Sequence, residues 1–573
     1  MRLVEFYIGN YRSLSKQTLQ CNNISALVGP NNAGKTNILS AVKLFFNTKT
    51  QTDLNDAHAK IQSNTILLRA IIQISGKLDK RDISKYNLLF LVNNDLMTIE
   101  RKHKTNEAAK YYYIRGKNRT LLKQNQLYYL QGLFRKHFIF IDLANDEHID
   151  YNNLESIVGY VIKNKFSDYQ EKQINDKTEA ALKNLNAKID GLYGPIKQRF
   201  LDNFSLSKKD ISFKLDIDAK KLMSFVKLYI NQGDPVHHLQ SKGHGIKNIA
   251  AYIFLGLFKY HSPSIIVIEE PESHLHPSYL RPFIQSLLSL STQKQIILTT
   301  HSCNVVDVIE PMNIYRVFQK NGYTKISKPK ITKKDVYDFY KYIYNKNAEC
   351  LFAKRVIIVE GISDSRILSN LSNKIISKVN KNKITLSFDQ NDIQVIEVTG
   401  GNFHGPISLL DAFNIDWMIV GDDDKWPKDF MRTIDALKLN KKHPIKYKYL
   451  TKMQLASIPM NNDIRKVLYE HFKIISVPTD IEKIILNKAN APIIKSIFKK
   501  YLPDRYKEKK KGSGGNNDLK LCYEIMKKHK PEWSIILSKE LPNSSISQGI
   551  IELIKLIVLK PAHGYIDQKL TEE

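Results

Sequence analysis

The stretch Ile265–Pro277, IIVIEEPESHLHP, decides how the rest of this chain is interpreted. Four apolar residues run directly into two adjacent carboxylates, Glu269 and Glu270. A short apolar run bounded by polar residues is typical of a buried parallel strand, and open α/β sheets bind ligands at the carboxyl edge of such strands. Taken alone, the stretch also fits a strand that ends in a surface turn. The segments before and after it decide between the two.

The composition indicates a basic protein with several domains. Its 573 residues suffice for about two to four domains. With 87 Lys and Arg against 57 Asp and Glu, the net charge is +30, which favours a polyanionic partner such as nucleic acid or an anionic membrane. A lysine-rich proteome is the alternative explanation.

We expect a cytoplasmic protein without a membrane segment. No apolar run approaches the roughly 20 residues that span a bilayer, and the N-terminus, MRLVEFYIGNYRS, alternates like a strand rather than a signal peptide. The four cysteines are far apart and show no metal-binding spacing, so we expect reduced thiols.

A phosphate-binding loop is predicted near the N-terminus. The predicted strand Ile24–Val28 leads into GPNNAGKT and then into an apolar-periodic helix, 37–46. Strand, glycine loop and helix are the context that such a loop requires. Backbone N–H groups would surround the phosphates, Lys35 would reach the β- and γ-phosphates, and the Thr36 hydroxyl would ligate Mg²⁺. The loop residues are Gly29, Pro30, Asn31, Asn32, Ala33, Gly34, Lys35 and Thr36.

The next region alternates like a set of strands. We expect strands at 66–74, 88–92, 111–114 and 138–142. Residues 101–119 are rich in Lys and Arg around three tyrosines, which fits a nucleic-acid face or an exposed hairpin, and we favour the hairpin.

Residues 144–230 show mostly polar helical spacing, which predicts a helical insertion that mediates dimerisation or forms a simple cap. A loop containing Ser241 and Gly243 then opens a predicted helix, and such a helix N-terminus binds anions.

Ile265–Pro277 can now be interpreted as part of a nucleotide site. Glu269 ends the predicted strand, where its carboxylate would hold Mg²⁺ directly or through water. Glu270 would polarise the water that attacks the γ-phosphate. A predicted helix, 279–290, leads to a strand at 295–298, and His301 follows that strand, where it would sense the γ-phosphate.

These motifs resemble those of ABC-type ATPases. GPNNAGKT, SKGHG, IIVIEEPESHLHP and TTHS look like the Walker A, signature, Walker B with D-loop, and H-loop motifs. They are most similar to the SMC/RecF-like subgroup, in which two nucleotide domains sandwich ATP. The resemblance implies ATP as a cofactor and a homodimer or higher oligomer. The signature departs from the usual Ser-Gly-Gly.

A second α/β unit begins near residue 348. One predicted strand ends in Glu360, with Asp364 starting the next helix, and another ends in Asp422-Asp423-Asp424. In a parallel sheet both strand ends face one crevice. Clustered carboxylates repel one another unless cations neutralise them. Oxygen ligands suit Mg²⁺ or Mn²⁺, and two such ions would serve a phosphodiester displacement. Acidic loops that cap helices are the alternative.

This second unit resembles the Toprim domain, whose motifs are a strand-end Glu and a later Asp-x-Asp. The resemblance implies that Glu360, Asp364, Asp422 and Asp424 are catalytic metal ligands. An ABC-type ATPase followed by Toprim is similar to the OLD (overcoming lysogenisation defect) nuclease family, which includes the Gabija nuclease and retron-associated effectors.

The OLD resemblance implies further residues and partners. Asp480 and Glu482 would ligate a second metal, and Lys539 would assist the chemistry. A role in antiviral defence is also implied, and the sequence leaves open whether a partner protein or nucleic acid restrains the nuclease. Two basic segments, 438–452 and 507–517, would be a DNA-tracking or solvated face and a flexible loop, respectively.

The sequence thus predicts an α/β protein with an ABC-type ATPase domain, a helical dimerisation insertion and a Toprim domain. The expected division is 1–143 and 231–345 for the ATPase, 144–230 for the insertion and 346–573 for the Toprim nuclease with its C-terminal helices. The expected function is an ATP-regulated, Mg²⁺- or Mn²⁺-dependent DNA endonuclease. An ATP-gated DNA clamp without cleavage, and a Toprim primase or topoisomerase, are the alternatives.

Overall fold

The structure is a computed structural model of the whole chain, and it divides into two compact units. The first comprises Met1–Ala26 and Thr36–Val308, and the second Leu27–Lys35 and Ile309–Glu573. The described residues are 1–46, 65–74, 77–104, 107–142, 173, 176–177, 229–230, 237–238, 264–273, 275, 277–344, 347–379, 382–398, 402–436, 459–478, 480–512, 518–528 and 530–559.

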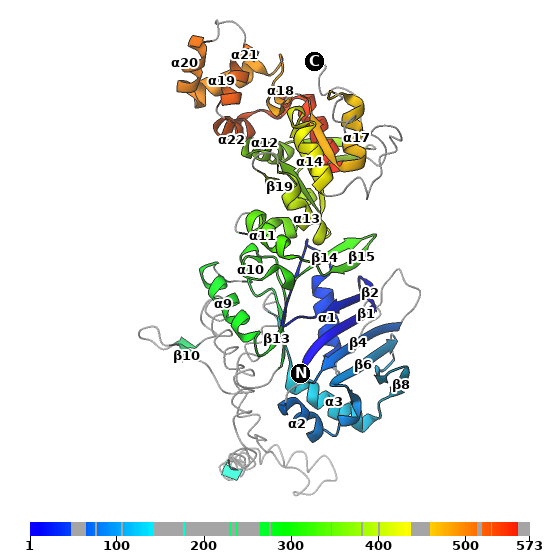
Figure 1. Ribbon diagram of the computed structural model, residues 1–573. Coiled ribbons are helices and arrows are strands. Elements are labelled where there is room, and N and C mark those ends of the chain that lie inside the picture. The colour runs from blue at the N-terminus through cyan, green and yellow to red at the C-terminus, as the bar shows by residue number, and fades with distance from the viewer. Residues whose placement is uncertain are drawn as a thin grey trace, which may run out of the picture. The chain divides into compact units, whose positions relative to one another are not determined.

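The first unit contains an antiparallel sheet with the strand order β2–β1–β4–β6–β7–β8 (Figure 1). Along β4, buried and half-buried residues alternate, as in a sheet with one face on a core. The predicted hairpin within 101–119 is confirmed, because β6, β7 and β8 pair as antiparallel neighbours. The strands are β1 Arg2–Tyr11, β2 Leu14–Gln20, β4 Thr65–Gln73, β5 Val92–Asn93, β6 Leu96–Lys104, β7 Lys110–Arg115 and β8 Asn118–Leu121.

The strand predicted at 88–92 is wrong over most of its length. Leu89–Leu91 forms a 3₁₀ turn, and β5 begins only at Val92. The side chain of Leu89 is 56% exposed. A short apolar run in a surface turn has the same composition as a buried strand, so periodicity alone cannot separate them.

Three parallel strands of the first unit position the acidic stretch. β12 (Ile265–Glu269) lies between β13 (Gln295–Thr299) and β9 (Phe138–Asp142), and all five of its residues are buried. The strands predicted at these places are confirmed. The remaining elements of this unit are β3 Ile24–Val28, α1 Lys35–Phe46, α2 Lys77–Lys85, α3 Gln124–His137, β10 Tyr229–Ile230, β11 His237–His238, α9 Pro277–Leu290 and α10 Cys303–Val306.

The second unit contains a four-stranded parallel sheet with the order β19–β16–β20–β21. The predicted strands that end at Glu360 and at Asp422 are β16 and β20. The strands of the second unit, including those outside this sheet, are β14 Ile314–Lys320, β15 Tyr323–Ser327, β16 Arg355–Val359, β17 Ile376–Val379, β18 Asn382–Thr385, β19 Ile393–Glu397, β20 Asp416–Asp422 and β21 Ile474–Val477.

Helices pack against this sheet, and further helices follow its last strand along the chain (Figure 1). One buried apolar cluster runs from β16 and β20 into the C-terminal helices and includes the fully buried Trp533. These helices therefore complete the core of the second unit. The helices of the second unit are α11 Lys333–Tyr342, α12 Ile362–Ser372, α13 His404–Ala412, α14 Lys428–Ala436, α17 Asn462–Phe472, α18 Ile481–Ile485, α19 Ala491–Tyr501, α20 Pro503–Gly512, α21 Asp518–Lys528, α22 Lys530–Glu540 and α23 Gln548–Leu559.

The loop predicted at 507–517 is helical in its first half. Helix α20 extends to Gly512, because Lys and Glu are good helix formers even in a highly charged run. Residues 513–517 lie outside the described residues, as do Ser241, Gly243, the basic segment 438–452 and nearly all of the predicted insertion 144–230.

The hairpin β14–β15 is tied to the parallel sheet by one buried arginine. The Arg316 guanidinium, on β14, donates to the carbonyl of Ala353 at 2.7 Å and to that of Asn414. These carbonyls precede β16 and β20, respectively. Burial lowers the pKa of Arg316 to about 10, so it remains a cation at neutral pH.

All four cysteines lie within the described residues and are free thiols. In the described part of the chain, no helix combines the length and apolar character needed to cross a bilayer.

Asp416 provides a pH test of this fold. Its carboxylate lies 2.8 Å from Arg355 Nε and 2.7 Å from Lys473 Nζ, at the amino edge of the parallel sheet. Burial acts to raise the pKa of Asp416, but these two cations outweigh it and lower the pKa to about 2. Because the folded pKa lies below the ordinary value of 3.8, the stabilisation is present above about pH 4 and is lost as the pH falls towards 2.

We therefore expect Asp416→Asn to lower the free energy of unfolding by about 2 kcal/mol at pH 7. The difference from wild type should shrink to nothing near pH 2, as measured by urea unfolding across pH. An equal loss at both pH values would contradict the ion-pair explanation.

Candidate functional site

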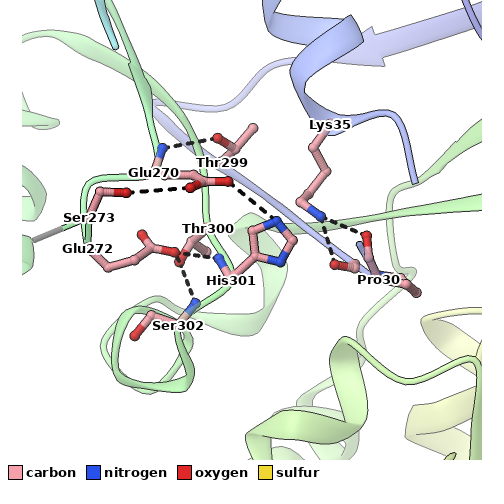
Figure 2. Close-up of polar contacts among 10 residues, drawn as sticks. Pro30, Lys35, Glu270, Glu272, Ser273, Thr299, Thr300, His301 and Ser302 are labelled. Atoms are coloured by element: carbon pink, nitrogen blue, oxygen red, sulfur yellow. Dashed lines mark hydrogen bonds and ion pairs between the residues drawn. The ribbon is translucent and has the colours of Figure 1, made fainter. Parts of the chain in front are cut away.

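The phosphate loop of the second unit follows directly from β3. Its backbone has positive φ at Gly29 (152°), Asn32 (58°) and Gly34 (98°), conformations that favour glycine and asparagine. The buried Lys35 ammonium donates to the carbonyls of Gly29 and Pro30, both at 2.8 Å (Figure 2). The loop therefore curls around the lysine that would contact a phosphate.

The hairpin β14–β15 holds the loop from the side. Gln319 Nε2 donates to the Asn32 carbonyl at 2.7 Å, and Thr324 Oγ1 donates to the Ala33 carbonyl at 2.8 Å. A Cβ atom added at Gly29 would lie 1.9 Å from the carbonyl oxygen of Val317. The close approach of loop and strand therefore requires glycine at this position.

The acidic stretch of the first unit places Glu270 next to His301 (Figure 2). Glu269 is buried at the end of β12. Glu270 follows with φ 45°, a left-handed conformation that a residue with a side chain adopts at a cost of about 1–2 kcal/mol. Its Oε1 lies 3.5 Å from His301 Nε2, and its Oε2 accepts from Ser273 Oγ at 3.4 Å. The structure thus brings together the predicted water-polarising acid and the predicted sensor histidine.

Glu272 supports this arrangement, and sequence reasoning missed it. Its Oε1 accepts from Thr300 Oγ1 at 2.8 Å and from the backbone N–H of His301 (Figure 2). Burial raises the pKa of Glu272, although these hydrogen bonds act to lower it. The side chain therefore ties the turn after β12 to the segment that carries the histidine.

The parallel sheet of the second unit gathers the second acid set at its carboxyl edge. Strands β16 and β20 pair in parallel, so Glu360, just after β16, and Asp422, the last residue of β20, emerge at the same edge. Asp364 lies in the first turn of α12, where a negative charge complements the helix dipole. Asp422 also pairs in register with Val477 at the end of β21.

Lys425 joins two of these acids, and sequence reasoning missed this residue too. Its Nζ lies 2.9 Å from Glu360 Oε1 and 3.5 Å from Asp424 Oδ1. Burial acts to lower the pKa of Lys425, but the hydrogen bond to Glu360 and the charge of Asp424 raise it overall. The sequence signal was a lysine directly after Asp422-Asp423-Asp424, the only cation adjacent to that run.

Asp423 has a different role from its neighbours. Its carboxylate pairs with the Arg465 guanidinium, and its Oδ1 accepts from Ser476 Oγ at 2.7 Å. Arg465 lies on α17 and Ser476 on β21, so Asp423 fastens the acidic turn to two neighbouring elements. Asp422 and Asp424 are thereby held on either side of an anchored residue.

Asp480 and Glu482, the residues predicted to bind a second metal, lie at the start of helix α18. Asp480 caps α18 by accepting from Lys483 N at 2.9 Å, and it also accepts from the Tyr523 hydroxyl. Glu482, on the same helix, is only 1% exposed. Their predicted role in metal binding stays a prediction.

Lys539 is not brought to the acid set. It is exposed on α22. Its carbonyl accepts from Lys374 just after the end of α12, whereas Asp364 lies in the first turn of that helix. Among the described residues, Lys425 is a lysine that contacts two of the acids, Glu360 and Asp424.

The donor chemistry of the acid set fits a hard divalent cation. Glu360 and Asp424 converge on one ammonium, which shows that this position favours positive charge. Carboxylate oxygens are the ligands that Mg²⁺ and Mn²⁺ prefer. Among the described residues, no group of three or more acidic, histidine or cysteine side chains already stands in metal-binding geometry. A metal would therefore have to draw the acids closer together.

These features define an α/β protein that joins a nucleotide-binding domain to a Toprim domain. Residues 24–307 match the family model described as "AAA domain, putative AbiEii toxin, Type IV TA system". Residues 351–424 match the model described as "Overcoming lysogenization defect protein-like, TOPRIM domain".

Two relatives make the resemblance more particular. The chain is 23% identical over 454 residues to Endonuclease GajA of Bacillus cereus (strain VD045), covering 74% of this chain and 75% of the relative. It is 23% identical over 474 residues to the Old nuclease of Escherichia phage P2, covering 74% and 77%. The SMC head domain from Thermotoga maritima is 16% identical, with a TM-score of 0.32, and covers 58% of this chain and 100% of that one. The predicted resemblance to the OLD family, with an ATPase domain before a Toprim domain, is confirmed.

Removal of the Glu272 carboxylate tests its supporting role. Glu272→Ala should lower the free energy of unfolding by about 1–3 kcal/mol, because Thr300 and the His301 N–H lose their acceptor. Glu272→Gln keeps an acceptor oxygen and should cost less. Because the folded pKa of Glu272 is raised above the ordinary 4.5, wild-type stability should fall relative to Glu272→Gln as the pH rises above that value. Urea unfolding across pH measures both effects, and equal losses in the two variants would contradict them.

Gly29→Ala tests the packing of the phosphate loop. The added Cβ would collide with the Val317 carbonyl, so the loop must shift, and we expect nucleotide affinity to fall at least about tenfold, or about 1.4 kcal/mol. Gly116→Ala is the matched control, since Gly116 also has positive φ (59°) but its Cβ would meet no atom within 4 Å. Fluorescent-nucleotide titration of both variants is the measurement. Unchanged affinity in Gly29→Ala would show that the loop accommodates a side chain.

Proposed function

We propose that this protein is a metal-dependent DNA endonuclease whose Toprim domain hydrolyses phosphodiesters under the control of ATP. The observation that carries the proposal is the convergence of Glu360 and Asp424 on one cation at the carboxyl edge of an OLD-like Toprim sheet. The names of two relatives, each covered over about three quarters of its length, support cleavage rather than clamping.

In the Toprim domain, Glu360, Asp364, Asp422 and Asp424 would hold Mg²⁺ or Mn²⁺. Bound metal supplies an activated water and neutralises charge on the phosphate. The chain itself fixes the acidic turn through the contacts of Asp423 with Arg465 and Ser476. The next residue, Asp424, is 70% exposed at the carboxyl edge of the sheet and therefore accessible to solvent. DNA can therefore approach this edge without a large opening.

In the nucleotide domain, Lys35 would bind the phosphates of ATP, and Thr36 and Glu269 would bind its Mg²⁺. Glu270 would orient water, with His301 beside it. We further propose a homodimer or higher oligomer, in which Ser241 and Gly243 complete the partner's nucleotide site. The proposed division is 1–143 and 231–345 for the ATPase domain, 144–230 for dimerisation and 346–573 for the nuclease. A role in antiviral defence follows from the OLD resemblance.

Cleavage of supercoiled DNA tests the proposal. Purified full-length protein is incubated with plasmid and Mg²⁺ or Mn²⁺, with and without ATP. Wild type should yield free ends, and Asp422→Ala should reduce cleavage at least about a thousandfold, as expected for the loss of a metal ligand. Lys35→Ala should change only the response to ATP.

Asp389→Asn is the matched control, because Asp389 is an exposed acid of the same unit that contacts Asn373 rather than the acid set. It should cleave like wild type. Cleavage by Asp422→Ala at the wild-type rate would refute the site. DNA ends covalently bound to protein would indicate a topoisomerase instead.

A further inference from the structure

The contact between Lys425 and the acid set raises the question of what happens when a metal binds. The ammonium lies 2.9 Å from Glu360 and 3.5 Å from Asp424. A divalent ion held by the same two carboxylates would need to lie about 2.0–2.6 Å from their oxygens. A metal that used the same two oxygens, Glu360 Oε1 and Asp424 Oδ1, would have to take the place of the ammonium, because it would need the space and the lone pairs that the ammonium occupies.

We propose that Lys425 is a tethered cation that holds the metal position in the metal-free protein and that a divalent metal must displace. This inference rests on the proposed function, since it takes Glu360 and Asp424 as metal ligands. Lys425 would thereby set the metal concentration at which the Toprim site fills. It is a positioning residue, because it acts through the acids rather than on the substrate.

The surroundings of Lys425 suit this role. Its side chain is only 15% exposed, whereas that of Asp424 is 70% exposed, so the ammonium lies beneath an acid that solvent and metal can reach. Because Lys425 follows Asp424 in one 3₁₀ turn, the tether is short and the ammonium cannot diffuse away.

Lys425 contacts both Glu360 and Asp424. Arg465 also contacts this turn, but it pairs with Asp423. Lys539 lies beside the end of α12. Lys425 is therefore the residue whose charge opposes metal entry most directly.

Repulsion gives the physical reason for such a device. Without a counter-charge, Glu360 and Asp424 would repel each other and would spread apart. The ammonium holds them near each other, so a metal that replaces it would start from acids that already share one counter-charge and would draw them closer still. The same ammonium competes with the metal, so its removal should tighten metal binding even though it leaves the acids less well ordered.

Metal affinity is the first test, with Mn²⁺ as the probe. Full-length, chelator-treated, nucleotide-free protein is titrated by calorimetry and by the paramagnetic resonance signal of free Mn²⁺. Lys425→Met removes the charge and keeps most of the stem, and it should bind Mn²⁺ about tenfold more tightly than wild type. Lys425→Arg keeps the charge and should stay within about threefold. Glu360→Gln combined with Asp424→Asn should abolish this binding.

Lys425→Gln serves as a second neutral variant in case Lys425→Met does not unfold cooperatively. Mn²⁺ affinity in the neutral variants that is equal to or weaker than in wild type would overturn the inference, as would absence of Mn²⁺ binding in all proteins. Metal-dependent cleavage that requires Asp422, with no gain in affinity on neutralising Lys425, would overturn this inference alone. The expected gain in affinity without any DNA cleavage would overturn the proposed nuclease function alone.

Lysine reactivity is the second test, and it follows displacement directly. Wild-type protein is acetylated briefly with and without Mn²⁺, and modification is quantified at Lys425 by peptide mass spectrometry. Mn²⁺ should increase labelling of Lys425 at least about threefold, because an ammonium released from its ion pairs is more accessible. Lys473, paired with Asp416 at the amino edge of the sheet, is the control and should not change. Equal labelling of Lys425 in both conditions would show that the metal leaves the ammonium in place.

Discussion

Repulsion between carboxylates is the constraint on which the Toprim half of this protein depends. Parallel strands deliver their carboxyl ends to one edge, so the sheet topology itself collects Glu360 and Asp422 there. The protein meets this repulsion in two ways. Asp423 is neutralised by Arg465 and becomes an anchor, while Asp424 and Glu360 share the ammonium of Lys425. The neighbouring residues Asp423 and Asp424 thus have different roles, each set by the cation that it contacts.

The nucleotide half solves a related problem with backbone geometry. Glu269 is buried, and the chain turns sharply at Glu270 into a left-handed conformation before it reaches Glu272. That turn separates the carboxylates, so that Glu270 faces the His301 side chain and Glu272 accepts from the backbone N–H of His301. The backbone at Glu270 adopts a less favourable conformation, and this conformation places the Glu270 side chain next to His301, as is common at functional sites.

The sequence was most informative where one physical cause dominated. Runs of β-branched residues identified β3, β12, β13, β16 and β20, because buried parallel strands leave few alternatives. It was least informative for contacts between distant residues. Nothing in the local pattern indicates that Arg465 meets Asp423 or that Glu272 accepts from His301, since such pairs depend on the finished fold. The apolar turn at Leu89 was mistaken for a strand because both have the same composition and tertiary context decides between them. The charged run of α20 was mistaken for a loop although its Lys and Glu residues favour a helix. Lys539 was chosen by family resemblance and its role stays a prediction, whereas the contact of Lys425 with the acids was not predicted.

The hairpin β14–β15 contacts two separate parts of the second unit, the phosphate loop and the segments that precede two strands of the parallel sheet. One of its strands carries Gln319 and Arg316, and the other carries Thr324. Gln319 and Thr324 donate hydrogen bonds to carbonyls of the phosphate loop. Arg316 donates to the carbonyls that precede β16 and β20, the strands that lead to the acid set. The same hairpin is therefore the shared neighbour of the phosphate loop and of the segments from which the two acid-bearing strands start.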